Sequence, residues 1–218
     1  MLRMTILTSL ALISFFSRPV FAQETKENQA PPQIFFIEAD GKKIPIELDK
    51  PFATSVLAGK ASVTLRAEPY KVFPYGGLRF SYPQEFSFSM MSDGPEVSIW
   101  SLTGSNGLIM VQRYANQPNP EALRQSVIEQ MTAQYQGGGG TVKQGEATLA
   151  LKPTPLKGIA LDVTAAGAKI RQELFSFPLG RDAFVLMLQD NPQADGKVSP
   201  DRAKVRKMLV DTLKLPEK

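Results

Sequence analysis

Cysteine and histidine are both absent from this sequence of 218 residues. Without cysteine, the chain can form no disulfide, thiolate nucleophile or thiolate metal site. Without histidine, it has no Ser-His-Asp triad, no histidine general base and no imidazole ligand for zinc. The two absences leave carboxylate chemistry as the remaining catalytic option. They predict a non-catalytic protein that has no metal site and no cofactor.

Dense basic stretches with interleaved aromatic residues are also missing, although Lys and Arg outnumber Asp and Glu by 25 to 21. A nucleic-acid surface uses such stretches to neutralise phosphates and to stack on bases. The sequence therefore predicts no nucleic-acid partner.

The N-terminus has the three-part order of a secretory signal peptide. Residues 1–4 carry the positive charge of Arg3, residues 5–16 are apolar, and residues 17–22 are polar and contain a proline. Small side chains favour cleavage after Ala22. The apolar run is shorter than the roughly 20 residues of a membrane span. We therefore expect a cleaved signal rather than a retained membrane anchor.

Cleavage after Ala22 would remove Arg3 and Arg18 and no acidic residue, which lowers the formal net charge from +4 to +2. A lipid anchor at the cut site is excluded because it requires a cysteine. We therefore expect a protein that is free in the periplasm or outside the cell, with an envelope protein as its partner.

Beyond the signal, the sequence divides into three parts. Residues 23–33 are polar and contain two prolines, which predicts a flexible leader. Residues 34–72 hold short alternating runs around an Asp-Gly turn and predict a small β unit. Pro45 favours an edge strand within that unit. Residues 73–218 form the main domain.

The main domain combines alternating runs with two helical patterns. Strands are expected at 78–82, 86–88, 96–102, 108–114, 141–151, 158–164, 169–177 and 183–189. Asn119-Pro120-Glu121 predicts the start of one helix, and Ser199-Pro200-Asp201 predicts the start of another. The predicted fold class is α+β: an antiparallel β-sheet with two amphipathic helices packed across it, preceded by a small β unit.

Five segments carry a resemblance to a known family. They are GLRFSYPQEFSF (77–88), PEALRQSVIEQM (120–131), KIRQELFSF (169–177), AFVLMLQ (183–189) and VRKMLVDTLK (205–214). Over about residues 75–216 the chain resembles the PsbP/Mog-like fold family, which includes the DcrB-like exported bacterial proteins. The resemblance implies an antiparallel sheet with helices across it, used mainly as a binding or assembly scaffold. No site motif of the family is matched here, so no functional residue is implied.

Three acidic pairs are candidates for carboxylate chemistry: Asp93 with Glu96, Asp162 with Glu173, and Asp190 with Asp195. The first pair occupies a turn, where aspartate commonly bonds its own backbone. The second pair lies on adjacent predicted strands beside Lys169 and Arg171, which favours an exposed cross-strand charge ladder. If one pair is catalytic, the alternative function is a carboxylate-dependent hydrolase acting on an envelope polysaccharide or peptide.

Two loops share only part of a ligand-binding pattern. Residues 190–196 lack the alternating oxygen ligands and distal glutamate of a calcium loop. Gly137–Gly140 follows a helix and lacks the Gly-Lys-Ser/Thr ending of a phosphate loop. Both segments therefore predict turns.

The last predicted helix and the single tryptophan each allow two interpretations. The helix carries four basic residues: Lys204, Arg206, Lys207 and Lys214. These residues could bind an acidic partner or a lipid surface. Alternatively, they complement the helix dipole, and the dipole interpretation is favoured. Trp100 lies on a predicted strand, where a core position is favoured over a binding face.

Overall fold

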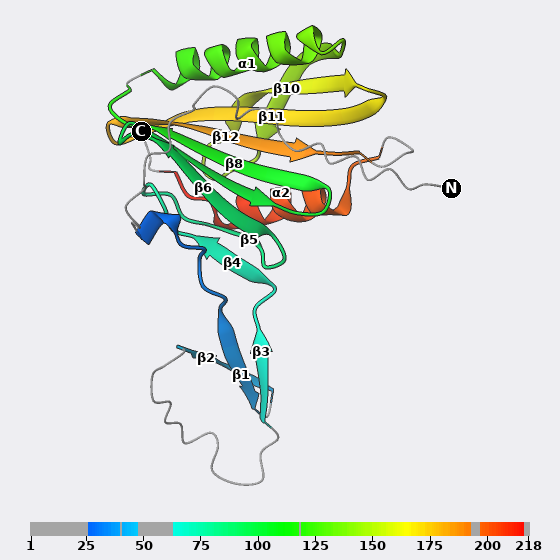
Figure 1. The fold of residues 1–218 in the computed structure, drawn as a ribbon. Coiled ribbons are helices and arrows are strands. Elements are labelled where there is room, and N and C mark those ends of the chain that lie inside the picture. The colour runs from blue at the N-terminus through cyan, green and yellow to red at the C-terminus, as the bar shows by residue number, and fades with distance from the viewer. Residues whose placement is uncertain (1–25, 40, 48–62, 118, 193–196, 216–218) are drawn as a thin grey trace.

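A computed structural model describes residues 26–39, 41–47, 63–117, 119–192 and 197–215 (Figure 1). The predicted signal peptide at 1–22 lies outside these residues, as do the first residues of the predicted leader. Among the described residues, no helix combines the length and the apolar character needed to cross a bilayer.

Strands dominate the described chain. The helices are η2 (Lys26–Asn28, a 3-10 turn), α1 (Pro120–Gly137) and α2 (Pro200–Thr212). The strands are β1 (Phe35–Ala39), β2 (Lys42–Ile46), β3 (Val63–Ala67), β4 (Tyr70–Phe73), β5 (Phe80–Pro83), β6 (Ser87–Asp93), β7 (Val97–Thr103), β8 (Gly107–Tyr114), β9 (Thr141–Leu149), β10 (Leu156–Ala165), β11 (Ala168–Leu179) and β12 (Asp182–Asp190).

The described strands form three antiparallel sheets. The largest has seven strands in the order β6-β7-β8-β12-β11-β10-β9. After β8 the chain crosses through α1 to the far edge of this sheet, then returns strand by strand until β12 pairs with β8. A separate hairpin pairs β4 with β5, and a small sheet has the order β2-β1-β3.

The predicted α+β class is wrong, because the described chain is mostly antiparallel sheet, with 51% in strands and 20% in helices. Only α1 packs across the strands as expected, on β9, β11 and β12, whereas α2 packs chiefly on β5 of the separate hairpin. Several strands are also longer than the alternating pattern indicated. Antiparallel neighbours keep their hydrogen bonds up to the turn, so β11 extends over Ala168–Leu179 instead of 169–177.

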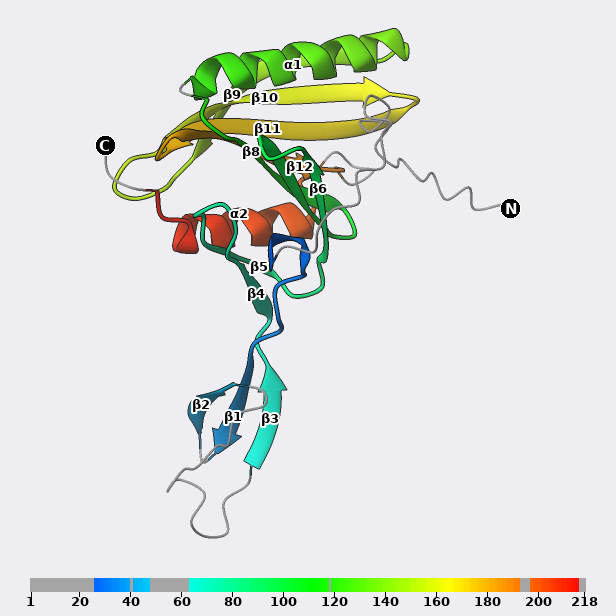
Figure 2. The ribbon, with the colours of Figure 1, turned by 60° about the vertical axis from the view of Figure 1, so that its left-hand side comes forward.

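Two apolar cores lie on the two faces of the seven-stranded sheet. Leu161, Leu174 and Val185 pack beneath α1 with Ile128 and other residues of that helix. The opposite face packs against α2 and the β4-β5 hairpin, and Figure 2 shows α1 and α2 on opposite sides of the sheet. The buried aromatic residues of this second core are Phe73, Tyr75, Phe80, Tyr82, Phe86, Trp100, Phe175, Phe177 and Phe184.

The helix starts follow from capping. The Asn119 side chain accepts a hydrogen bond from the backbone N–H of Ala122 at 3.0 Å, and Ser199 Oγ accepts from the backbone N–H of Arg202 at 3.2 Å. Each cap satisfies a backbone donor that the first turn leaves without an intrahelical partner. Both helices therefore begin where the sequence predicts.

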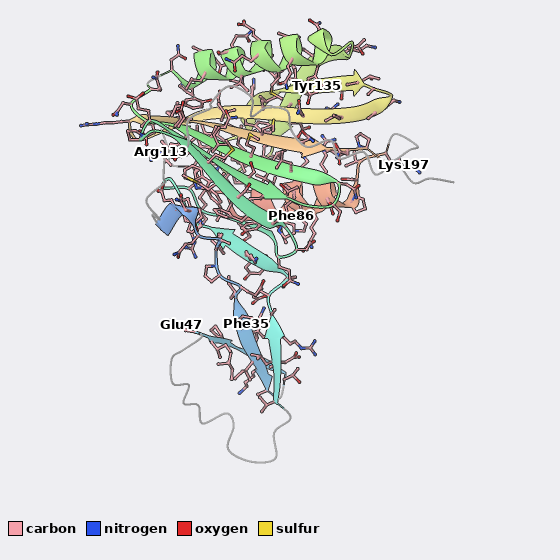
Figure 3. The ribbon with its side chains drawn as sticks, in the orientation of Figure 1. Phe35, Glu47, Phe86, Arg113, Tyr135 and Lys197 are labelled. Atoms are coloured by element: carbon pink, nitrogen blue, oxygen red, sulfur yellow. The ribbon has the colours of Figure 1, made fainter. Side chains whose placement is uncertain are left out.

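Strands β1, β2 and β3 form a small sheet, here called the arm (residues 35–39, 42–46 and 63–67). In both ribbon views the arm stands away from the seven-stranded sheet, on the far side of the β4-β5 hairpin (Figures 1 and 2). Phe35 marks the arm in Figure 3, Glu47 directly follows strand β2 of the arm, and Arg113 marks the main sheet. The arm corresponds to most of the small β unit predicted at 34–72.

Tyr82 is fully buried, and its hydroxyl has no hydrogen-bond partner among the described residues. Burial, together with the nearby Tyr75, raises the pKa of Tyr82 from 10.0 to about 12. The unfolded chain therefore releases this proton first as the pH rises, so stability is full below pH 10 and is lost between about pH 10 and 12. Over this pH range the free energy of unfolding falls by about 2–3 kcal/mol because of Tyr82.

We expect Tyr82→Phe to abolish that part of the alkaline loss. At pH 7 the variant should unfold with an unchanged free energy, or one higher by up to about 1 kcal/mol, because an unsatisfied buried hydroxyl is removed. Urea unfolding at pH 7 and pH 11 measures both effects. Tyr135→Phe is the control, since it removes a hydroxyl that accepts from Gln172 Nε2 at 3.0 Å and should destabilise at pH 7.

Candidate functional site

Four charged residues of alternating sign form a straight row across the seven-stranded sheet. Lys143 on β9 lies opposite Asp162 on β10, Asp162 lies opposite Arg171 on β11, and Arg171 lies opposite Asp190 on β12. Directly opposed residues in antiparallel strands point to the same face. All four side chains therefore lie on the α2 face, and we call this row the charge ladder.

The centre of the charge ladder is an exposed ion pair. Arg171 Nη1 donates to both carboxylate oxygens of Asp162, at 2.8 and 3.0 Å. The Asp162 side chain is 54% exposed, and that of Arg171 is 31% exposed. Arg171 Nε points inward, where its nearest ionic neighbour is Glu173 Oε1 at 3.6 Å. Arg171 thus connects the exposed Asp162 to the buried Glu173.

Glu173 is that buried acid, with only 3% of its surface exposed. Arg202 and Arg206, both from α2, each donate to a different oxygen of its carboxylate. Two guanidinium groups therefore compensate the charge that burial would otherwise make costly. The contact fixes the first turns of α2 on the sheet.

Asp190, at the end of the charge ladder, is also buried and joins the same network. Its carboxylate accepts from Ser199 Oγ and from the Ser199 backbone N–H, the latter at 3.4 Å. Arg202 Nη1 lies 3.8 Å from the same carboxylate. The residue that caps α2 is therefore held by β12.

A cavity of about 540 Å³ opens over the charge ladder. It lies where the chain enters α2, the end of the sheet marked by Lys197 in Figure 3. Its lining residues are Thr141, Lys143, Asp162, Val163, Thr164, Lys169, Ile170, Arg171, Asp190, Pro192, Val198 and Arg202. We call this cavity the ladder pocket.

The predicted acidic pairs are distributed differently from the expectation. Asp162 and Glu173 share a face, but Asp162 lies opposite Arg171 and Glu173 lies opposite Ala160. The charge ladder predicted beside them is present, although Glu173 is buried beneath it rather than exposed. Asp190 lines the ladder pocket together with Asp162, whereas its predicted partner Asp195 lies outside the described residues.

Asp93 and Glu96 are exposed at the β6-β7 turn, far along the sheet from the ladder pocket. Gly137–Gly140 ends α1 and leads into β9, as the turn interpretation predicted. Within the described residues, no cluster of three or more acidic side chains is arranged to hold a metal ion.

The basic residues of α2 are largely paired. Lys204 Nζ contacts Glu85 Oε1 at 2.7 Å, and Lys207 pairs with Asp211. Arg206 binds Glu173, so the α2 cations act mainly within the protein.

Trp100 is fully buried, as the core interpretation predicted. Its Nε1 donates to the backbone carbonyl of Glu27 at 3.3 Å, and Tyr75 donates to the carbonyl of Gln29. Part of the segment predicted as a flexible leader thus lies against the aromatic core. Sequence patterns carried no signal for this contact, because both acceptors are backbone atoms.

The arm has one polar and one apolar face. On the polar face, Arg66 Nε binds Glu38 at 2.6 Å, and Lys43 lies 4.1 Å from the ring centre of Phe36. Apart from Lys42, the opposite face is apolar: Phe35, Ile37, Ala39, Ile44, Ile46, Val63, Leu65 and Ala67. Val63 is 48% exposed and Leu65 is 61% exposed.

The alternation of Val63-Thr64-Leu65-Arg66 was sufficient to predict a strand. It did not identify Val63 and Leu65 as exposed, because side-chain alternation separates two faces without saying which one the protein covers. Only the tertiary structure shows that these two apolar side chains remain accessible.

No protein-family model matches this chain, and no curated protein matches it either. The resemblance to the PsbP/Mog-like family therefore stays a prediction from the sequence, and the chain's function has to be inferred from its own geometry.

Proposed function

We propose that this chain is an exported, non-catalytic binding protein of the bacterial cell envelope, and that it docks onto an envelope protein through the arm. The observation that carries the proposal is the exposure of two side chains on the apolar face of the arm, Val63 at 48% and Leu65 at 61%. Apolar side chains gathered on one exposed surface favour burial against a partner.

The two edges of the arm differ in their ability to accept another strand. Strand β2 contains Pro45, which has no backbone N–H to donate to a neighbour. Strand β3 contains neither proline nor glycine, and all five of its residues are exposed. Because β1 is the central strand, the outer side of β3 has no strand partner in the described sheet. The β3 edge is therefore the open edge.

An extended strand from a partner protein fits this edge best. Backbone hydrogen bonds to β3 would supply affinity, and alternate side chains would supply specificity. The partner strand should place apolar residues beside Val63 and Leu65. On the other face it should place polar residues beside Thr64 and Arg66, whose guanidinium is already paired with Glu38.

Two further features support an accessory role outside the cytoplasm. The N-terminal sequence has the order of a cleavable signal, with cleavage after Ala22. The carboxylates of the candidate pair Asp162 and Glu173 are bound by arginine, Asp162 by Arg171 and Glu173 by Arg202 and Arg206. Such pairing is typical of a structural charge network, which makes the hydrolase alternative less favoured.

Photo-crosslinking tests the arm directly. The full precursor, with p-benzoylphenylalanine in place of Leu65, is expressed in the source bacterium and irradiated. We expect a product that joins this chain to one envelope protein, in a periplasmic or extracellular fraction where the mature chain begins at Gln23. The same label in place of Met91, another exposed apolar residue at 43%, should give no such product.

A matched pair of variants completes the test. Val63→Thr/Leu65→Thr places β-branched residues, which suit a strand, at both positions of β3 but removes apolar area, so it should reduce capture of the crosslinked protein at least tenfold. Met91→Thr/Val198→Thr removes exposed apolar residues outside the arm and should leave capture unchanged. Equal losses in both variants, or a crosslinked product containing only two copies of this chain, would contradict the proposal.

A further inference from the structure

We infer that the ladder pocket is a binding site for a phosphate group. The pocket is separate from the arm, and the inference does not depend on the proposed docking function. Its volume of about 540 Å³ lies within the usual range for small-molecule sites.

The charge of the pocket lining favours a dianion. Four basic side chains line it, from Lys143, Lys169, Arg171 and Arg202, against the two carboxylates of Asp162 and Asp190. The formal excess is two positive charges. A phosphate group carries about that charge with the opposite sign at neutral pH.

The excess positive charge belongs to two lysines. Arg171 is paired with Asp162, and Arg202 binds Glu173 and approaches Asp190. Lys143 and Lys169, in contrast, have no ion-pair or hydrogen-bond partner in the described structure. Each ammonium group has three donors, so two sets of charged donors are available at the mouth of the pocket.

The geometry of the sheet lets these two lysines converge. Lys143 is on β9 and Lys169 is on β11, with β10 between them. Neighbouring strands are about 4.8 Å apart, so the two strands are separated by about 10 Å. A lysine side chain reaches about half that distance or more, and both side chains point to the α2 face.

Two hydroxyl groups lie next to the lysines: Thr141 is two residues from Lys143 on β9, and Thr164 is on β10, between the two lysine strands. Thr141 on β9 lies directly opposite Thr164 on β10, and Thr164 lies next to Lys169 on the β11 side. The threonines share the α2 face with Lys143 and Lys169, one row beyond the charge ladder. Hydroxyl donors together with lysines are the side chains that commonly contact phosphate oxygens.

The inner wall adds rigidity. The Nε atom of Arg171 is buried and faces Glu173 Oε1 at 3.6 Å. Its Nη1 atom is held by Asp162, so the guanidinium is already oriented along the row. A phosphate bound by Lys143 and Lys169 would therefore lie near an Arg171 guanidinium whose orientation is already fixed.

Titration with inorganic phosphate tests this site. Amide chemical shifts of the mature, isotope-labelled chain are followed by NMR as phosphate replaces chloride at constant ionic strength. We expect saturable shifts at Thr141, Thr164 and Lys169. Lys143→Gln/Lys169→Gln should weaken this binding at least tenfold.

The matched control is Lys152→Gln/Lys157→Gln, which removes the same charge from two exposed lysines that do not line the pocket. It should bind phosphate within twofold of the wild type. Shifts that do not saturate, or an equal loss in both double variants, would overturn the proposal.

A second arm separates a free phosphate compound from a lipid headgroup. The wild type and Lys143→Gln/Lys169→Gln are sedimented with phosphatidylglycerol vesicles. Cosedimentation of the wild type that the double substitution abolishes assigns the site to a lipid headgroup. Saturable binding of inorganic phosphate without cosedimentation assigns it to a soluble phosphate compound. Absence of both kinds of binding refutes the site.

Discussion

Glu173→Ala is expected to lower the free energy of unfolding by about 3–5 kcal/mol. The Glu173 carboxylate is 3% exposed and is bound by Arg202 and Arg206, with Arg171 Nε at 3.6 Å. Removing the carboxylate leaves guanidinium groups at the base of α2 without their buried counter-charge. The fixed contact between α2 and the sheet is lost with it. Urea unfolding at pH 7 measures the change.

Asp162→Asn is the matched control for this prediction. Asp162 also binds an arginine on the same face of the sheet, but its side chain is 54% exposed. Exposed ion pairs contribute at most about 1 kcal/mol. The two substitutions should therefore differ by at least about 2 kcal/mol, and similar losses would show that burial does not determine the contribution of Glu173.

Gly158→Ala is expected to lower the free energy of unfolding by about 2–3 kcal/mol, the upper part of the usual range for overpacking a filled core. A Cβ atom at this position would lie 2.3 Å from the backbone oxygen of Leu174 and 2.6 Å from the Phe175 ring. A carbonyl within a strand cannot move aside without disturbing the pairing of β10 with β11. Thermal and urea unfolding both report the loss.

Gly145→Ala separates this steric effect from the general effect of replacing a strand glycine. Gly145 lies on the neighbouring strand β9, and an added Cβ would meet no atom within 4 Å. Alanine also reduces the conformational freedom of the unfolded chain. We therefore expect Gly145→Ala to be neutral or slightly stabilising, and a loss as large as that of Gly158→Ala would contradict the steric explanation.

Much of the local structure was predictable because its causes are local. Asn119 and Ser199 cap the two helices through their own neighbours, so both helix starts are confirmed. The antiparallel pairing of β10 with β11 follows from a short Ala-Gly turn, in which Gly167 has a φ of +79°. The neighbours that fix these features lie within a few residues in the chain.

The fold class was predicted wrongly because the extent of each strand depends on its neighbours. Alternation marks where a strand is favoured, but hydrogen bonding to a partner decides how far it continues.

The packing of α2 was also predicted wrongly, because it too depends on residues distant in the chain. Its apolar stripe predicted a buried face, yet β5 competes with the main sheet for that face, and the Ser81 backbone N–H donates to Thr212 Oγ1 at 2.8 Å.

The amino-acid sequence by itself determined the chemistry that this protein lacks, the starts of its helices and the alternation of its strands. The tertiary structure alone decided which charges meet. Asp162 pairs with Arg171 because antiparallel register places them opposite each other, while Glu173, two residues further along β11, is buried by arginines of α2. Register and helix docking join residues distant in the chain, and a one-residue change of register would reverse every face.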